Sequence, residues 1–276
     1  MMTINEILEI KNSQIIKKQK IIQEIGLLET PKFVLQTGAR NFDETLGGGF
    51  HSHTQYLIFG ANKTGKTQLC HQLCVQAYMQ FSNIYENQKR KKYPFIFYLD
   101  TENTFRPERI KELILKSKVE YKELLRNILV SKIMSNSALL LALKQLENLL
   151  KTNYLSVLII DTINNYYNSE LANKSISVNK TKSTFLKVLD KIEQYRKNYN
   201  LITISTAQIS SNLGIKTSIR ALPGGYKLLN QYFSEYIYLS YKEQDKRYVQ
   251  IINSLNLPEK RLLYKITSLG IQDYKI

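Results

Sequence analysis

Residues 60–73 read GANKTGKTQLCHQL and follow directly on the apolar run YLIF at 56–59. The first eight of them fit the Walker A pattern G-x4-G-K-T, in which glycines let the backbone turn its N–H groups toward phosphate oxygens. The apolar run predicts a buried strand. The residues after the loop predict a helix, whose N-terminus adds positive potential. The sequence therefore predicts a phosphate-binding loop between a strand and a helix.

The residues of this loop have expected roles in holding a nucleotide. Lys66 is expected to reach the β- and γ-phosphates of ATP, and the Thr67 hydroxyl to bind Mg²⁺. The expected ATP-binding set is Gly60, Ala61, Asn62, Lys63, Thr64, Gly65, Lys66, Thr67 and Gln68. The alternative, a glycine-rich turn that binds no ligand, is disfavoured because the strand and the helix lie where the motif requires them.

Two further apolar runs end in carboxylates. LIID (158–161) predicts a strand whose last residue, Asp161, lies at the phosphate crevice and joins Thr67 in holding Mg²⁺. YLDTE (98–102) ends in the same way, so Glu102 is the candidate catalytic residue that orients the attacking water. From these residues alone, a capping role for Asp161 and a structural ion pair for Glu102 remain open.

Apolar runs alternate with helical patterns from about residue 33 onward. Strand-like runs lie at 55–59, 95–99, 127–130, 157–160 and 201–205, and helical patterns at 66–80, 107–118, 136–150 and 181–197. This alternation predicts an α/β fold with a mostly parallel sheet and helices on both faces. Three later runs, at 236–240, 248–252 and 262–266, are separated only by turns and predict an antiparallel C-terminal extension.

Two parts are expected along the chain: an N-terminal helix and linker arm at 1–35, and a core at 36–276. The arm has a helical pattern over residues 3–28 that starts at a capping box formed by Thr3 and Glu6. Such an arm can pack on the core or bind a partner, and the sequence leaves both open.

The charge balance favours a polyanionic partner. The chain has 39 Lys+Arg against 23 Asp+Glu, a net charge of +16, although a lysine-rich composition can arise without any nucleic-acid contact. No apolar run approaches the roughly 20 residues that cross a bilayer, and the N-terminus lacks the layout of a secretory signal. We expect an intracellular protein of the cytoplasm, nucleoid or nucleus that does not bind membranes.

The cysteines do not suggest a metal site. Cys70 and Cys74 are the only two, and their spacing puts them on one face of the helix that follows the loop. Two ligands are too few for structural zinc, so we expect buried thiols.

The stretches YLDTENTFRPERI (98–110) and GANKTGKTQLCHQL (60–73) resemble the RadA branch of the RecA recombinase family, which includes eukaryotic strand-exchange recombinases and their paralogues. The family's version of the first stretch is close to Y-I-D-T-E-G-T-F-R-P-E-R, so Asn103 replaces a glycine. The resemblance covers roughly residues 36–276. It implies a RecA-like P-loop NTPase core that uses ATP and Mg²⁺ and acts on DNA in homologous recombination and repair.

The resemblance also implies roles for single residues. Glu102 matches the water-activating glutamate, and Arg106 matches the arginine of the R-P-E-R element that contacts adenine. Gln208 matches a strand-end glutamine that senses the γ-phosphate and passes its state to a DNA-binding loop. The resemblance further implies that ATP lies at or near a subunit interface, and hence self-association across the ATP site.

Two polar, basic segments become candidate loops for contact with DNA, single-stranded DNA in particular. The first, about residues 164–180, carries Tyr166, Tyr167, Lys174 and Lys180, and the second, about residues 209–223, carries Lys216 and Arg220. Basic side chains can contact the phosphate backbone and tyrosines can stack on bases. Connections that do not touch DNA are the alternative.

Several departures from the family argue against an autonomous filament-forming recombinase. The sequence ahead of the core is shorter than the family's helical DNA-binding domain, and no Phe is followed three residues later by Ala, as in the family's polymerisation tetrapeptide. The second loop looks shorter, the first lacks arginines, and Asn230 or Gln231 replaces the histidine that couples ATP to DNA. We therefore expect a paralogue, a slow, DNA-stimulated, Mg²⁺-dependent ATPase. It would assist or remodel filaments of a RadA-like recombinase or a sister paralogue.

Three other functions remain open at this point. The chain can be an ATP-stabilised scaffold that barely hydrolyses and binds proteins through residues 1–35. It can be a strand-exchange enzyme that polymerises through another contact, or a RecA-like signalling ATPase unconnected to DNA.

Overall fold

The computed structural model describes residues 32–86, 94–210, 222–241, 246–255 and 257–274. One compact unit spans Phe33–Ile276. It includes strand β1 (Val34–Leu35), which pairs antiparallel with β2 (Phe50–His51). Residues 1–31 of the N-terminal arm lie outside the described residues, so its helix, its role and the division at residue 36 stay predictions.

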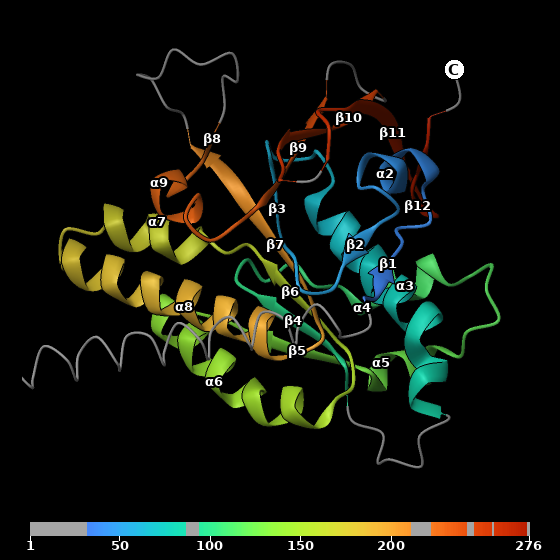
Figure 1. Cartoon of the computed structure of the whole chain (residues 1–276), viewed down its shortest axis with the longest axis horizontal. Coiled ribbons are helices and arrows are strands. Elements are labelled where there is room, and N and C mark those ends of the chain that lie inside the picture. Colours follow the sequence, from blue (N-terminus) through green and yellow to red (C-terminus); the bar gives the residue numbers. More distant parts are fainter. Residues whose placement is uncertain (1–31, 87–93, 211–221, 242–245, 256, 275–276) are drawn as a thin grey trace, which may run out of the picture. The chain divides into compact units, whose positions relative to one another are not determined.

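A ten-stranded sheet runs through the described part of the chain, in the order β12-β11-β10-β9-β3-β7-β6-β4-β5, with β8 beside β7 (Figure 1). The strands are β3 (Gln55–Gly60), β4 (Ile96–Asp100), β5 (Ile128–Lys132), β6 (Ser156–Asp161), β7 (Leu201–Ser210), β8 (Leu222–Pro223), β9 (Glu235–Tyr241), β10 (Arg247–Asn253), β11 (Arg261–Thr267) and β12 (Gly270–Asp273). The neighbouring strands β9, β3, β7, β6, β4 and β5 pair in parallel, whereas β10, β11 and β12 are antiparallel to their neighbours and β8 is antiparallel to β7. The predicted parallel sheet with an antiparallel C-terminal extension is confirmed.

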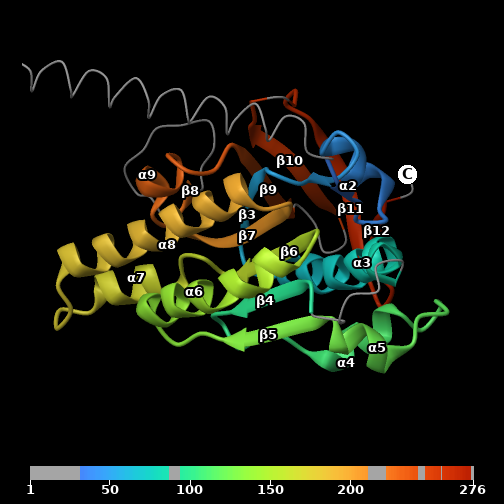
Figure 2. The same cartoon turned by 60° about the horizontal axis from the view of Figure 1, so that its bottom comes forward.

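Helices cover both faces of this sheet (Figures 1 and 2). One face packs against α2 (Arg40–Thr45), α3 (Lys66–Glu86), α4 (Pro107–Leu113) and α5 (Tyr121–Arg126). The other packs against α6 (Asn136–Thr152), α7 (Asn165–Ala172), α8 (Val178–Asn198) and α9 (Tyr226–Leu229). Among the described helices, none is long and apolar enough to cross a membrane.

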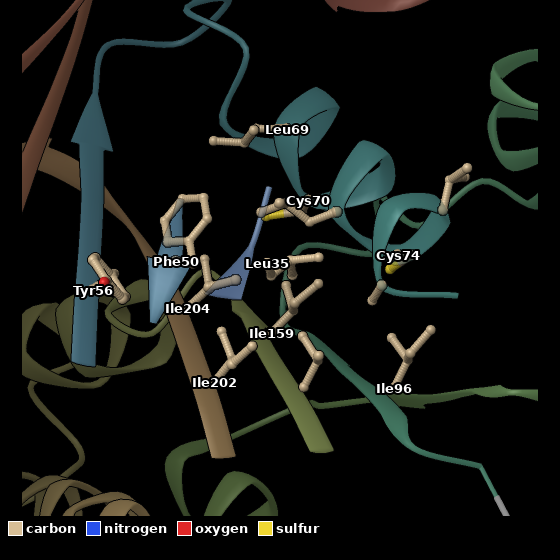
Figure 3. Packing of buried hydrophobic residues seen from close by; sticks show 14 of the residues in the cluster. Leu35, Phe50, Tyr56, Leu69, Cys70, Cys74, Ile96, Ile159, Ile202 and Ile204 are labelled. Atoms are coloured by element: carbon tan, nitrogen blue, oxygen red, sulfur yellow. The ribbon is translucent and has the colours of Figure 1, made fainter. Parts of the chain in front are cut away.

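The central strands are buried on both faces, which explains their uninterrupted apolar runs. In β6, Ile159 belongs to the cluster under α3, whereas Ile160 belongs to the cluster under α6 and α8. Figure 3 shows Cys70 and Cys74 of α3 on the same side of the strands as Ile159. Both thiols are buried and unpaired, as predicted, and burial raises the pKa of each.

The structure corrects the predicted end of one helix. The helix expected over 107–118 ends at Leu113, and residues 114–117 form a turn. The backbone N–H and the hydroxyl of Ser117 both donate to the carbonyl of Ile114, at 2.8 and 2.9 Å, which closes the turn before a further helical residue can add. Helix α5 and strand β12 are also absent from the sequence prediction, because both are short.

Candidate nucleotide site

The loop at 60–67 joins the end of β3 to the start of α3, as predicted. A Cβ at Gly60 would lie 2.2 Å from the carbonyl oxygen of Leu239 in β9. Gly65 has a φ of 103°, and a Cβ there would lie 2.6 Å from Cδ1 of Ile266 in β11. Both glycines are therefore required by the geometry, Gly60 by the close approach of the Leu239 backbone and Gly65 by its positive φ.

The Lys66 ammonium lies within the curl of this loop. Its Nζ donates hydrogen bonds to the carbonyl oxygens of Gly60 at 2.8 Å and Ala61 at 3.1 Å, and the residue is 8% exposed. Burial lowers the pKa of Lys66, while Asp161 and Glu102 act to raise it. A buried cation with two carboxylates nearby is suited to phosphate oxygens, because the low local dielectric strengthens the attraction.

The antiparallel C-terminal strands hold the loop from outside. The hydroxyl of Tyr264, in β11, donates to the carbonyl of Thr64 at 2.5 Å, and Nε of Arg247, in β10, donates to the carbonyl of Lys63 at 3.5 Å. In a trans peptide the C=O and the following N–H point in opposite directions, so the Tyr264 bond also fixes the direction of the Gly65 N–H. The sequence did not indicate Tyr264 or Arg247, since neither belongs to a recognisable motif.

Asp161 is fully buried and accepts hydrogen bonds from three hydroxyls. Its Oδ2 accepts from Thr67 Oγ1 and from the Tyr98 hydroxyl, each at 2.8 Å, and its Oδ1 accepts from Thr206 Oγ1. The structure thus brings together Thr67 and Asp161, the two residues expected to hold Mg²⁺. Tyr98 and Thr206, which orient the carboxylate, were missed by the sequence reasoning.

These residues fit a magnesium–nucleotide complex. Mg²⁺ prefers hard oxygen ligands and is commonly bound through one or two protein groups, with phosphate oxygens and waters completing its shell. The hydroxyl of Thr67 and the carboxylate of Asp161 are such ligands, and Lys66 and the two glycines provide the phosphate cradle. Within the described ranges, no group of three or more His, Cys, Asp or Glu could hold a metal ion.

Glu102 follows β4 and contacts two polar side chains beyond the nucleotide loop. Its Oε1 accepts from Gln208 Nε2 at 2.6 Å and from Thr162 Oγ1 at 2.8 Å. A hollow of about 450 Å³ adjoins it, lined in part by Gln208, Asn165 and Tyr166. The two candidates Glu102 and Gln208 are therefore in direct contact, and Thr162 is a third member that the sequence reasoning missed.

Asn103, the departure from the family's glycine, preserves the backbone conformation. Its φ is 57°, in the left-handed region that glycine adopts freely and that asparagine tolerates better than most residues. The replacement therefore keeps the turn between Glu102 and α4.

Arg106 and Arg109 have different partners. The backbone N–H of Arg106 donates to Nε2 of His71 at 2.9 Å, and its guanidinium donates to the carbonyls of Asn103 at 3.0 Å and Phe105 at 2.9 Å. Arg109 Nε instead donates to Oε1 of Gln68 at 2.7 Å. Arg109, which the sequence reasoning missed, thus contacts Gln68 of the expected ATP-binding set, and the adenine contact of Arg106 stays a prediction.

His71 connects α3, the helix that follows the loop at 60–67, to the chain after Glu102. Its Nδ1 lies 2.7 Å from the carbonyl of Thr67, while Nε2 accepts the Arg106 N–H. The carbonyl accepts and the N–H donates, so the ring is neutral with its proton on Nδ1. Burial lowers the pKa of His71, which agrees with this neutral form.

The first candidate DNA segment is largely helical, which corrects the predicted loop. Residues 164–180 contain α7 and the first residues of α8, which begins where the Ser177 side chain accepts the Lys180 N–H. Tyr167 is 5% exposed and stacks on Phe185 with ring centroids 4.3 Å apart, so its ring is a core group and is not accessible to a base.

The other candidate DNA residues differ in exposure. Tyr166 is half-buried and its hydroxyl points to the sulfur of Met134 at 3.9 Å, whereas Lys174 and Lys180 are exposed. Lys216 and Arg220 lie outside the described residues. Tyr166, Lys174 and Lys180 therefore stay candidates on accessible surface.

The family model described as Rad51 matches residues 31–274. The chain is 29% identical over 277 residues to the meiotic recombination protein DLH1 of Candida albicans, covering 96% of this chain and 83% of that protein. It is 28% identical over 249 residues to the meiotic recombination protein DMC1/LIM15 homologs of Mus musculus and Homo sapiens, covering 88% of this chain and 71% of each relative. The expected RecA-like α/β fold is thereby confirmed.

Proposed function

The chain belongs to the Rad51 family, and we propose that it is an ATP-dependent DNA-binding protein of homologous recombination and DNA repair. More specifically, it is a paralogue of the RadA-like branch that assists or remodels recombinase filaments on DNA. Its ATPase is Mg²⁺-dependent, slow and stimulated by DNA.

The contact between Gln208 and Glu102 carries this proposal. A carboxylate at the position of Glu102 can accept the hydrogen bond of the water that attacks the γ-phosphate. Gln208 holds that carboxylate at 2.6 Å and directly precedes the basic segment at 209–223. DNA bound to this segment would therefore act on the orientation of the catalytic carboxylate through a single side chain.

The remaining residues of the site have separate roles in phosphoryl transfer. Mg²⁺, when bound, neutralises the charge on the β- and γ-phosphate oxygens. Thr67 and Asp161 hold it, and Tyr98 keeps the Asp161 carboxylate oriented. Lys66 binds the phosphates from within the loop, and Glu102 positions the water.

Exposed lysines near the start of α8 support DNA contact. Lys174 precedes this helix and Lys180 lies in its first turn, where no acidic residue offsets them. The positive end of the helix adds to their attraction for phosphate, and the net charge of +16 acts in the same direction. Together with Tyr166, these residues form the proposed surface for single-stranded DNA, and Lys216 and Arg220 stay further candidates for DNA contact.

The paralogue role is supported by one position in particular. The family resemblance implies a coupling histidine after the glycine pair at 224–225, and Asn230 or Gln231, which directly follow α9, replaces it. An amide lacks the titration and the second ring nitrogen of histidine, so we infer weak coupling and slow turnover. The partner is then a RadA-like recombinase or a sister paralogue, with self-association across the ATP site as a further contact.

DNA binding with and without Mg–ATP tests the proposal. Binding of labelled single-stranded DNA, followed by fluorescence anisotropy over a salt series, should be tighter with Mg–ATP and should weaken steeply with salt. A matched series with double-stranded DNA tests the strand preference. A DNA affinity that depends on neither nucleotide nor salt would contradict a DNA-binding role. Extended filaments formed by this protein alone would contradict the paralogue role.

A further inference from the structure

Asn164 is a fully buried side chain that bonds to two separate parts of the backbone. It lies three residues after Asp161 and is the N-cap of α7. Its Oδ1 accepts the N–H of Gln208 at 3.0 Å, and its Nδ2 donates to the carbonyls of Gln208 at 2.9 Å and Gly224 at 3.1 Å. The side-chain amide of Asn164 thus bonds both the N–H and the carbonyl of Gln208, and it bonds the carbonyl of Gly224 as well.

Gln208 and Gly224 flank the segment at 209–223, and they also bond directly. The Gly224 N–H donates to the carbonyl of Gln208 at 3.0 Å, and Ile209 pairs with Pro223 where β7 meets β8. Asn164 therefore holds the two ends of this segment at the point where they come together.

The next residue ties the same helix to the other side of the site. Asn165 Nδ2 donates to the carbonyl of Thr101 at 2.7 Å, directly before Glu102. The start of α7 thus binds the chain before Glu102 through Asn165 and the backbone of Gln208 through Asn164. Gln208 and Glu102 then meet through their own side chains at 2.6 Å.

We propose that Asn164 is a positioning residue that couples the 209–223 segment to Glu102. It fixes the backbone of Gln208, so the amide of Gln208 reaches the Glu102 carboxylate only while both ends of the segment are held. The inference rests on the proposed function, in which that carboxylate orients the attacking water and the segment binds DNA. Asn164 itself takes no part in the chemistry.

Asparagine suits this role because its short side chain carries one acceptor oxygen and an NH₂ group with two donors. Aspartate has the same shape but presents only acceptors to the carbonyls of Gln208 and Gly224. Alanine removes all three bonds. The variants Asn164→Asp and Asn164→Ala therefore test the same contact by repulsion and by deletion.

Asn136 provides a matched control for the loss of a buried amide. It is 1% exposed and its Nδ2 donates to Oε2 of Glu170 at 2.9 Å, a contact outside the nucleotide site. Asn136→Ala should therefore show what a loss of stability alone does to hydrolysis. The loss of stability is measured as the shift in melting temperature.

Steady-state hydrolysis by the full chain, with and without single-stranded DNA, tests the coupling. Both Asn164 variants should lower kcat by about tenfold, the effect of roughly one lost hydrogen bond on a positioned group, and leave the KM for ATP unchanged. The ratio of kcat with DNA to kcat without DNA should fall toward one. Asn136→Ala should leave both kcat and the ratio at the wild-type values.

Amide hydrogen exchange gives a second readout that does not require DNA. The N–H groups of Gln208 and Gly224 should exchange faster in both Asn164 variants and at the wild-type rate in Asn136→Ala. The proposal is overturned if the N–H groups of Gln208 and Gly224 exchange at the wild-type rate in the Asn164 variants. It is also overturned if these variants have the same kcat and the same stimulation by DNA as Asn136→Ala. If the wild-type protein ignores DNA, the proposed function fails, while the exchange and kcat comparisons still decide the role of Asn164.

Discussion

The side-chain amide of Gln208 donates a 2.6 Å hydrogen bond to Oε1 of Glu102, across the end of β6. Thr162, directly after β6, donates to the same oxygen at 2.8 Å. Two donors, one from β7 and one from directly after β6, thus orient in advance the carboxylate that follows β4, which is how a site stabilises a transition state without reorganising during the reaction.

Replacement of the carboxylate should separate binding from hydrolysis. Glu102→Gln keeps the size of the side chain but is a far weaker acceptor for the proton of the attacking water. We expect ATP affinity within about twofold of wild type and a fall in kcat of roughly 10²–10³-fold. Titration of a fluorescent ATP analogue and a phosphate-release assay measure the two effects, and equal turnover would place the catalytic role elsewhere.

Removal of the buried cation should abolish nucleotide binding. Lys66→Ala deletes the ammonium that lies in the loop and leaves the carbonyls of Gly60 and Ala61 without that donor. We expect an ATP affinity at least about 100-fold weaker and no measurable hydrolysis, because a charge-assisted contact to phosphate is lost. Isothermal titration with Mg–ATP measures the affinity, and an unchanged value would remove the loop from the nucleotide site.

The hydroxyl of Tyr264 should matter for affinity rather than for chemistry. Tyr264→Phe deletes the 2.5 Å bond to the carbonyl of Thr64 and frees the direction of the Gly65 N–H. Loss of about 1 kcal/mol corresponds to a Kd for ATP and ADP that is roughly fivefold weaker, with kcat at saturation unchanged.

A second tyrosine provides the control for this prediction. Tyr236 is 1% exposed, and its hydroxyl finds no hydrogen-bond partner among the described residues. Tyr236→Phe should therefore leave the Kd for nucleotide unchanged. If both variants shift the Kd equally, the Tyr264 contact does not position the loop.

His71 predicts a dependence of stability on pH. Burial lowers its pKa below the ordinary value of 6.5, and the folded protein uses the neutral ring to bond Thr67 and Arg106. As the pH falls through about 6.5 the unfolded chain binds more protons than the folded one, so the free energy of unfolding decreases. The stabilisation is fully present above that pH and declines below it.

Urea unfolding at pH 7.5 and pH 5.5 measures this decline. His71→Gln cannot titrate, so the variant should lose less stability than the wild type between the two pH values. Equal losses in both proteins would show that other groups cause the acid destabilisation.

The parts of the site that the sequence predicted are those with a local signature. The loop at 60–67 has fixed spacing, and the apolar runs that end at Asp161 and Glu102 mark strands buried on both faces. Since the carboxyl ends of parallel strands lie on one edge of a sheet, the convergence of Asp161, Glu102 and Gln208 follows from the predicted topology.

The parts that the sequence missed depend on register and packing. Tyr98 and Thr206 reach Asp161 only because of the strand register: β4 and β6 end level, with Asp100 opposite Asp161, and Ser205 of β7 lies opposite Ile160, which brings Thr206 beside Asp161. Tyr167 looked like a surface tyrosine in a polar segment, but α7 turns its ring against Phe185. A short polar stretch has no clear period, so its sequence did not distinguish a helix from a loop.

Steady-state ATP hydrolysis by the purified protein, with and without single-stranded DNA at low and moderate salt, tests the central claim most directly. The contact between Gln208 and Glu102 predicts that DNA raises kcat and that moderate salt removes the increase as the DNA dissociates. Hydrolysis at one rate under all four conditions, with DNA shown to be bound at low salt, would contradict a coupling between the nucleotide and DNA sites.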